Sequence, residues 1–277
     1  MKILVGTLYS GENEYDDCKA AIQKQTFQAF DHLLIENLPE LEAHNKLYKT
    51  FIDKKDQYEL LVKVDADTVL ISDRLFERIV EKFAKNRKLE VLNIGVQDFF
   101  TNEMITAGIQ IYRNTVRWDF NKDTLFPDIP IMKKEAFRFD KTDLAPAAIH
   151  CKNPSIEQAF HYGVHRGLKS IQRDYSTTHW ALLGKVWENF LRTGDKRIGL
   201  AVLGAELVYA GKFSREDQNY TNPQMVLVLK KYETMNARDI KREITKLRWL
   251  HWGWLPKDWR RMVIRFWRGR VEGRWDK

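Results

Sequence analysis

The feature that most constrains the fold is the alternation of short apolar runs with helical patterns through the first half of the chain. Between the strand-like runs lie helical patterns that end near Lys24, span Lys46 to Asp53, and span Asp73 to Asn86. Such alternation predicts an α/β fold with a mostly parallel sheet covered on both faces by helices. The strand-like runs are ILVGTL, HLLIENL, LLVKVDAD, EVLNIGV and ITAGIQIYR.

Two aspartates stand out in the run LLVKVDADTVLI, which otherwise reads as one buried strand. Asp65 and Asp67 are two residues apart, so in a strand their carboxylates point to the same side near its carboxyl end. Ligands of parallel sheets bind beyond that end. Two carboxylates this close repel each other unless something positive lies between them, and a D-x-D pair is suited to Mg²⁺ or Mn²⁺ that in turn neutralises a diphosphate.

The second half is less regular at first and then helical. Residues 117–148 contain three prolines and read as a long loop at the sheet edge. Asn153-Pro154 predicts a helix start, with the helix running to about Arg166. KSIQRDYS predicts one more strand, and helices follow from about Trp180 to Gly211. We therefore expect one domain over residues 1–215 and a separate helical tail over 216–277.

In the order of its motifs, the chain resembles the GT-A nucleotide-sugar glycosyltransferases, particularly family 2. The opening ILVGTLYSGENEYDDCKAAIQKQTFQAFDHLLIENL, the helix start AHNKLYKTF, and DAD follow one another as in that family. MITAGIQIYR resembles the strand beneath the acceptor site, and PSIEQAFHYGVHRGLKS resembles the helix that carries the catalytic base. The resemblance covers about residues 1–180 and implies a Rossmann-like GT-A domain.

The resemblance also implies a set of site residues. Asp65 and Asp67 would hold the cation and the donor diphosphate, with His179 of STTHW completing the metal site and His150 as a second candidate ligand. The remaining residues would line the donor pocket: Thr7, Tyr9, Glu12, Glu36, Asn45 and Lys46.

The catalytic base is where the sequence departs from the family. The helix start usually shows Glu-Asp, whereas this chain has Glu157-Gln158. An inverting transfer needs a group that takes a proton from the acceptor hydroxyl, and glutamine does not accept one. Glu157 is the predicted base, with Asp98 and Asp143 in reserve; a glutamate favoured by the helix dipole is the alternative interpretation of Glu157.

Two histidines at helical spacing, His161 and His165, resemble a zinc pair. HYGVH lacks the glutamate that follows the first histidine of a metalloprotease motif, so a polar helix face is the favoured interpretation.

The tail carries all of the excess charge. The whole chain has a formal net charge of +8, and from Lys241 to Lys277 twelve basic and four acidic residues give 12 − 4 = +8. Six of the nine tryptophans lie in the same segment. In PKDWRRMVIRFWRGR the apolar residues fall on one helical stripe beside arginines, a pattern typical of a helix in an anionic membrane interface. The alternative is packing on the body of the protein; no nucleic-acid-binding fold is recognisable.

Cysteine usage and the N-terminus indicate the compartment. Cys18 and Cys151 are far apart and lack metal-type spacing, which favours reduced thiols. The first apolar stretch is too short for a signal peptide. We expect a cytoplasmic protein, peripheral at the inner face of the plasma membrane.

Three hypotheses about function follow. The first is a metal-dependent glycosyltransferase that moves a sugar from a nucleotide donor to a glycan or lipid-linked acceptor with inversion. The second is a haloacid dehalogenase-like phosphatase, since VDADTVLI resembles that family's first motif, with Asp65 as nucleophile and Asp67 as acid/base; Val69 stands where threonine is usual. The third is a non-catalytic, membrane-bound GT-A-like protein, which Gln158 favours.

Overall fold

A computed structural model describes residues 1–127, 131–132, 143–171, 176–215 and 222–250. The chain forms two compact units, Met1–Pro154 and Ser155–Lys277. The expected domain boundary after residue 215 lies inside the second unit, between helices α6 (Lys196–Tyr209) and α7 (Pro223–Lys230).

The first unit is built on a seven-stranded sheet of order β2-β1-β3-β6-β5-β9-β4. Its pairings are parallel for β1 with β2 and β3 and for β5 with β9, and antiparallel for β6 with β3 and β5 and for β4 with β9. Five of the seven strands therefore run in one direction, so the expected α/β fold with a mostly parallel sheet is confirmed. The strands are β1 (Ile3–Tyr9), β2 (Phe30–Glu36), β3 (Leu60–Lys63), β4 (Thr68–Leu70), β5 (Val91–Asp98), β6 (Met104–Arg113) and β9 (Ala148–His150).

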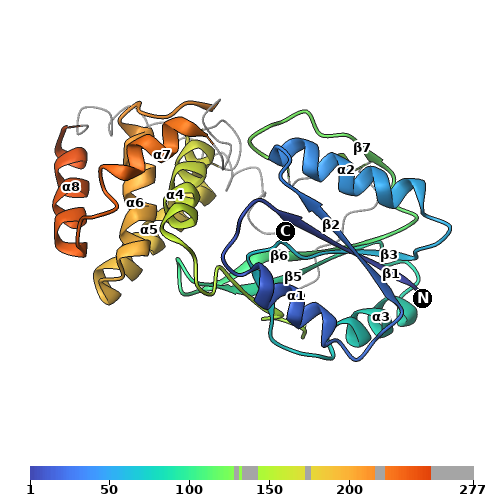
Figure 1. Cartoon of the computed structure of the whole chain (residues 1–277). Helices are drawn as coiled ribbons and strands as arrows, with labels where there is room; N and C mark the ends of the chain where they lie inside the picture. Colours follow the sequence, from blue (N-terminus) through green and yellow to red (C-terminus); the bar gives the residue numbers. More distant parts are fainter. Residues whose placement is uncertain (128–130, 133–142, 172–175, 216–221, 251–277) are drawn as a thin grey trace, which may run out of the picture. The chain divides into compact units, whose positions relative to one another are not determined.

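Helices cover both faces of this sheet (Figure 1). On one face α1 (Tyr15–Gln23) and α3 (Leu75–Lys85) pack their buried side chains against the strands, and on the other face α2 (Glu40–Asp53) does so. Strand residues alternate between the two apolar clusters, Leu60 and Val62 facing α1 and α3 while Leu61 faces α2. A small separate ladder pairs β7 (Trp118–Asp119) with β8 (Ile131–Met132).

The sheet curls between β3 and β4. Only four residues, Val64 to Asp67, separate these two strands along the chain, although three strands lie between them in the sheet. Four strand spacings of about 4.8 Å exceed the reach of so short a connection, roughly 17 Å. Curling therefore brings the end of β3 close to β4 and β9.

The described residues of the second unit form helices joined by short turns. Its helices are α4 (Ile156–Ser170), α5 (Ser176–Thr193), α6, α7 and α8 (Ala237–Leu250). The predicted strand KSIQRDYS is wrong at both ends, because Lys169 and Ser170 continue α4 and Ser176 begins α5. Phe160, Val164 and Leu168 form a buried stripe at helical spacing that carries α4 to this point.

Two glycines let α4 and α6 cross in backbone contact. A Cβ added at Gly163 would lie 1.7 Å from the carbonyl oxygen of Ala201, and one at Gly204 would lie 2.6 Å from the carbonyl oxygen of Phe160. Only hydrogen fits at these positions, so the sequence requires glycine there. α6 is correspondingly buried along nearly its whole length.

The segment predicted to lie in a membrane interface, Pro256 to Arg270, falls outside the described residues. Within the described part of the chain, none of the helices combines the length and the apolar character needed to cross a bilayer.

Candidate functional site

The two aspartates of DAD lie in a turn rather than in one continuous strand. β3 ends at Lys63 and β4 begins at Thr68, whose amide donates to the carbonyl of Asp65 at 2.9 Å and so closes the turn. The prediction of a single strand is therefore wrong, because aspartates stabilise turns through their short polar side chains. The turn separates the surroundings of the two carboxylates.

Asp65 is paired inside the protein. The Nζ of Lys63, a side chain only 4% exposed, lies 2.6 Å from its Oδ2. The thiol of buried Cys18 approaches the carbonyl oxygen of Asp65 at 3.6 Å. A buried lysine thus supplies the positive charge that Asp65 needs.

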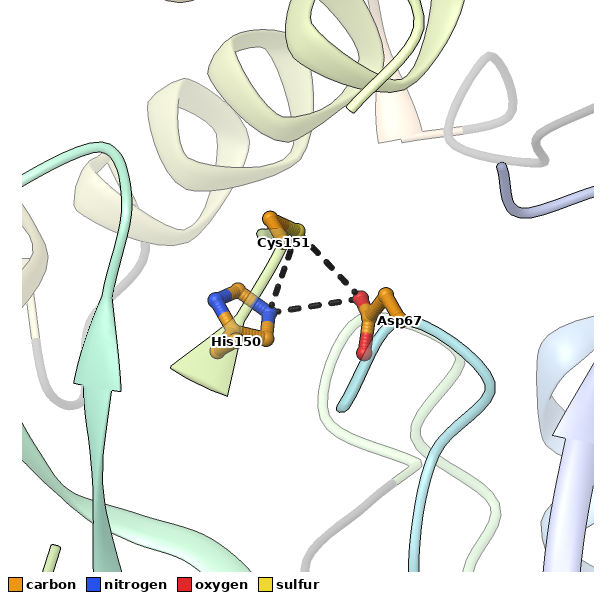
Figure 2. Close-up of side chains that lie close together, drawn as sticks. All are labelled: Asp67, His150 and Cys151. Atoms are coloured by element: carbon orange, nitrogen blue, oxygen red, sulfur yellow. Dashed lines mark hydrogen bonds and ion pairs between the residues drawn. The ribbon is translucent and has the colours of Figure 1, made fainter. Parts of the chain in front are cut away.

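Asp67 faces the end of β9 (Figure 2). Its Oδ2 lies 3.3 Å from the Nε2 of His150 and 3.5 Å from the Sγ of Cys151, and Sγ and Nε2 are also 3.5 Å apart. The register of β4 with β9 aligns Thr68 with His150, and the amide of Cys151 donates to the carbonyl of Asp67 at 2.7 Å. Backbone pairing therefore fixes this cluster.

Asp98 lies behind His150, at the end of β5. Its Oδ1 is 2.7 Å from the Nδ1 of His150, and its Oδ2 accepts from the backbone amide of Thr101 at 2.8 Å and from the Thr101 hydroxyl at 2.7 Å. Both carboxylate oxygens are therefore occupied, and the Asp98 side chain is fully buried. Asp98 orients the imidazole so that Nε2 is directed at Asp67.

Asp67, His150 and Asp98 form a row of contacts in which each group shifts the pKa of its neighbour. Burial acts to raise the pKa of Asp67, but the charge and hydrogen bond of His150 outweigh it and hold that pKa well below its ordinary value. The pKa of Asp98 is lowered too: burial opposes the change, and the bonds from His150 and Thr101 prevail. Burial acts to lower the pKa of His150, but its acidic neighbours raise it well above the ordinary value. The two carboxylates therefore favour the protonated form of His150. A metal ion bound at Nε2 would have to displace that proton.

The loop after β1 contributes a further carboxyl group. Burial raises the pKa of Glu12 to about 7. A hydrogen bond from the amide of Ser10 at 2.6 Å opposes this rise, and the negative charges of Asp67 and Asp65 add to it. Tyr9, at the end of β1, stacks on Tyr15 with ring centroids 4.3 Å apart. Glu12 is therefore close enough to the DAD turn to be repelled by the charges of Asp65 and Asp67. A cation bound at the turn would reduce this repulsion.

The other residues predicted for the donor pocket are less closely grouped. Buried Thr7 bonds to the Nε2 of His32 at 2.9 Å, and exposed Glu36 pairs in register with Tyr9. The side-chain amide of Asn45 donates to the carbonyl of Asn121 at 3.0 Å, while Lys46 is exposed on α2.

Three other predicted residues have surroundings of their own. Asp143 is exposed and pairs with Arg78 and Lys82 of α3. Glu157 is exposed in the first turn of α4, in the second unit. His179 is in α5 of that unit, where the Nη1 of Arg166 approaches its Nδ1 at 3.2 Å.

Gln158 has a structural role in the second unit. Its side chain accepts from the amide of Ser155 at 2.9 Å, and its own amide donates to the Ser155 hydroxyl at 3.1 Å, forming a capping box. The N-cap is therefore Ser155, and the predicted cap at Asn153-Pro154 was two residues early.

Sequence reasoning missed Cys151 and Lys63. In the sequence, Cys151 is marked only by its position directly after His150. Its closeness to the DAD turn follows from the register of β4 with β9, which the sequence does not give. Lys63 could have been found from its spacing, because it is two residues before Asp65 and side chains two residues apart in a strand point to the same side.

The cluster has the donors of a cation site. One atom each from Asp67, His150 and Cys151 lie within 4.8 Å of one another. A carboxylate behind the imidazole, here Asp98, is the usual support of a metal-binding histidine. Burial raises the pKa of the Cys151 thiol, so Asp67 and His150 are the stronger ligands. A carboxylate with an imidazole suits Mn²⁺ or Zn²⁺ better than Mg²⁺, which prefers oxygen. Neither Asp65 nor His179 belongs to this group.

Comparison with known proteins gives little to set beside this geometry. No family model matches the chain, and no curated protein matches it. Among solved structures, the crystal structure of A197 from STIV is similar with a TM-score of 0.33 and 13% sequence identity, over 42% of this chain and 66% of that one. A likeness of this extent supports neither a fold family nor a function.

Proposed function

We propose that this protein is a metal-dependent glycosyltransferase that transfers a sugar from a nucleotide-sugar donor. The observation that carries the proposal is the placement of Asp67, from the turn after β3, 3.3 Å from the Nε2 of a histidine oriented by a buried carboxylate. This cluster lies at the carboxyl end of β3, the edge at which α/β sheets bind their ligands.

The strand arrangement supports the same proposal. β1, β2 and β3 are parallel neighbours whose carboxyl ends carry Tyr9, Glu36 and the DAD turn. A nucleoside bound across these ends would meet an aromatic pair and several acidic groups. The acidic groups bind a diphosphate only through a cation, which is the reason that the metal cluster matters to the proposal.

Asp67 and His150 would hold Mn²⁺, with Cys151 beside them and Glu12 in the surrounding shell. The bound cation would stabilise the negative charge that develops on the departing nucleoside diphosphate. Asp65, paired with Lys63, would then orient the donor instead of ligating the metal.

Of the predicted bases, Glu157 suits the role better than Asp98. The Asp98 side chain is fully buried and both of its oxygens are engaged by His150 and Thr101, so it is closed to an acceptor hydroxyl. Glu157 is exposed, and the capping box leaves its side chain out of the cap. We assign Glu157 as the base and a glycan or lipid-linked alcohol as the acceptor, with the basic tail as the attachment to an anionic membrane.

The phosphatase hypothesis has less support. Its nucleophile would be Asp65, yet that carboxylate forms a 2.6 Å ion pair with buried Lys63, which lowers the nucleophilicity of the oxygen it holds. Two strand-helix units also precede the motif in the sheet unit.

Thermal unfolding with nucleotides tests the proposal. The full chain is melted with UDP, GDP, CDP and dTDP, each with and without Mn²⁺, and the series is repeated for Asp67→Ala and for a control, Asp53→Ala, at an exposed helix end. Ligand at 100 times its Kd stabilises the folded state by about 2.7 kcal/mol. We expect one nucleotide to raise the midpoint only with Mn²⁺, in the parent and in Asp53→Ala but not in Asp67→Ala.

The failure of every nucleotide to shift the midpoint would rule out the transferase. In that case, Mg²⁺-dependent hydrolysis of p-nitrophenyl phosphate that disappears in Asp65→Asn would identify the phosphatase. Nucleotide binding without transfer or donor hydrolysis would point instead to the non-catalytic protein.

A further inference from the structure

A cavity of about 570 Å³ lies at the end of the sheet opposite to the DAD turn. Its walls come from the end of α2 with the turn that follows, and from residues 114–119, which follow β6. The amide of Asn114 donates to the carbonyl of Glu59 at 3.0 Å, directly before β3 begins. The cavity therefore lies near the amino end of β3, whereas the DAD turn follows the carboxyl end of that strand.

The inner wall of the cavity is apolar and aromatic. Phe51 and Val116 line it and are buried members of the apolar cluster beneath α2, and partly buried Trp118 packs against that cluster. β7 lies beside α2 (Figure 1), with the ring centroids of Trp118 and Phe51 6.1 Å apart and those of Trp118 and Tyr48 4.8 Å apart. A ligand in this cavity therefore meets aromatic and aliphatic surface.

Hydrogen bonds join the two walls of the cavity. The side-chain amide of Asn114 donates to the carbonyl of Lys55 at 2.9 Å, which links the segment after β6 to the turn after α2. The hydroxyl of Thr115 donates to a carboxylate oxygen of Glu90 at 3.0 Å. A ligand does not have to bring these walls together, so little of its binding free energy is lost in ordering them.

Three exposed charged residues line the cavity: Lys55, Arg117 and Asp119. Within the part of the chain that the structure describes, none of the three has an ion-pair partner. Two cations and one carboxylate give the cavity a net charge of 2 − 1 = +1. A singly charged anion balances this excess, whereas a doubly charged phosphate would leave a net negative charge beside Asp119.

We propose that this cavity binds a small aromatic carboxylate. The ring lies against the wall of Phe51 and Trp118, and the carboxylate accepts hydrogen bonds from Arg117, whose planar donors match its two oxygens. Lys55 supplies the second positive charge. The volume is in the range of about 300–1,000 Å³ that is usual for small-molecule sites, which combine apolar walls with a few polar groups. The inference does not rest on the proposed function, because it involves neither the DAD turn nor a transfer step.

Isothermal titration calorimetry of the full chain with 2-naphthoate tests this inference, in the absence of metal and nucleotide. 2-Naphthamide is the neutral analogue, and 2-naphthyl phosphate is the doubly charged one at about pH 8. We expect 2-naphthoate to bind about tenfold or more tightly than the amide, which cannot form charge-assisted hydrogen bonds with Arg117. It should also bind more tightly than the phosphate, which Asp119 repels.

Two variants and one control separate the charge from the cavity. Arg117→Gln should weaken 2-naphthoate binding by about tenfold or more, since it removes the charged donors. Ile52→Trp keeps both cations and fills the cavity with a larger side chain, so it should abolish binding. Arg87→Gln makes the same charge change at an exposed residue outside the cavity lining, and it should bind as the parent does. None of the three positions is fully buried, and a melting midpoint close to that of the parent verifies that each variant is folded.

The inference is overturned if 2-naphthoate does not bind, or if Arg117→Gln and Ile52→Trp bind it as the parent does. Equal affinity for 2-naphthamide would refute the requirement for an anion, and tighter binding of 2-naphthyl phosphate would refute the assignment of a single negative charge. Because neither metal nor nucleotide is present, this result is independent of the experiment that tests the transferase.

Discussion

The carboxylate behind His150 gives the sharpest prediction about the candidate site. Asp98→Asn removes the negative charge that favours the protonated imidazole of His150. The asparagine also has only one carbonyl oxygen, so its NH₂ group has to face either His150 or the donors of Thr101. His150 needs one acceptor and Thr101 supplies two donors, so an asparagine cannot satisfy all three contacts. The variant keeps the shape of the side chain and loses its electrostatic role.

The magnitude follows from these contacts. Hydrogen bonds to a charged group contribute about 1.5–3 kcal/mol each, and breaking a buried ion pair costs about 3–5 kcal/mol. We therefore expect the free energy of unfolding of the sheet unit to fall by about 3–5 kcal/mol. For a chain of this size that corresponds to a melting midpoint lower by about 6–20 °C.

Thermal unfolding of the full chain, followed by circular dichroism, measures this effect. Asp143→Asn is the control, because it makes the same chemical change in the same unit at an exposed ion pair. The control should melt close to the parent. If Asp98→Asn lowers the midpoint no more than Asp143→Asn does, then the row Asp67–His150–Asp98 does not form as described.

Three further predictions concern pH, capping and helix packing. The folded pKa of Glu12, about 7, lies above its ordinary 4.5, so its contribution to stability is present below pH 4.5 and is lost as the pH rises through 7; Glu12→Gln should melt above the parent at pH 8 and with it at pH 4.5. Ser155→Ala should lower the free energy of unfolding by about 1 kcal/mol, as should Gln158→Ala, whereas Glu157→Ala should abolish transfer without changing the melt. Gly163→Ala should strongly destabilise the helical unit, whereas Gly184→Ala, which meets no atom within 4 Å, should stabilise it by about 0.5–1 kcal/mol; urea unfolding of the pair compares them directly, and equal midpoints would contradict the close crossing of α4 and α6.

The sheet was largely predictable because its strands carry their own signal. Leu60 to Lys63 and Val91 to Asp98 are apolar runs bounded by polar residues, and the helices between them have single apolar faces. The sequence does not indicate which strand pairs with which in the sheet. Asp67 and Asp98 were both marked as functional residues, yet only the pairing of β9 with β4 and β5 reveals that His150 lies between them.

Local patterns failed where two interpretations compete over a short segment. Lys169 to Ser176 alternates in the manner of a strand, but α4 already extends to Ser170 on the buried stripe of Phe160, Val164 and Leu168. VDADTVLI reads as continuous β structure until the chain has to turn towards the far edge of a curled sheet. In both cases a tertiary contact overrides the local preference.

The backbone contact at Gly163 and Gly204 has a mechanical consequence. Two helices that touch without intervening side chains cannot slide or rotate past each other by changing rotamers, so α4 and α6 move as one rigid pair. Glu157 lies near the start of α4, three residues or about 4.5 Å of helix before Phe160, where the contact with α6 begins. Substitutions deep in α6 should therefore displace the proposed base from a distance and alter turnover without touching any group that meets the substrate.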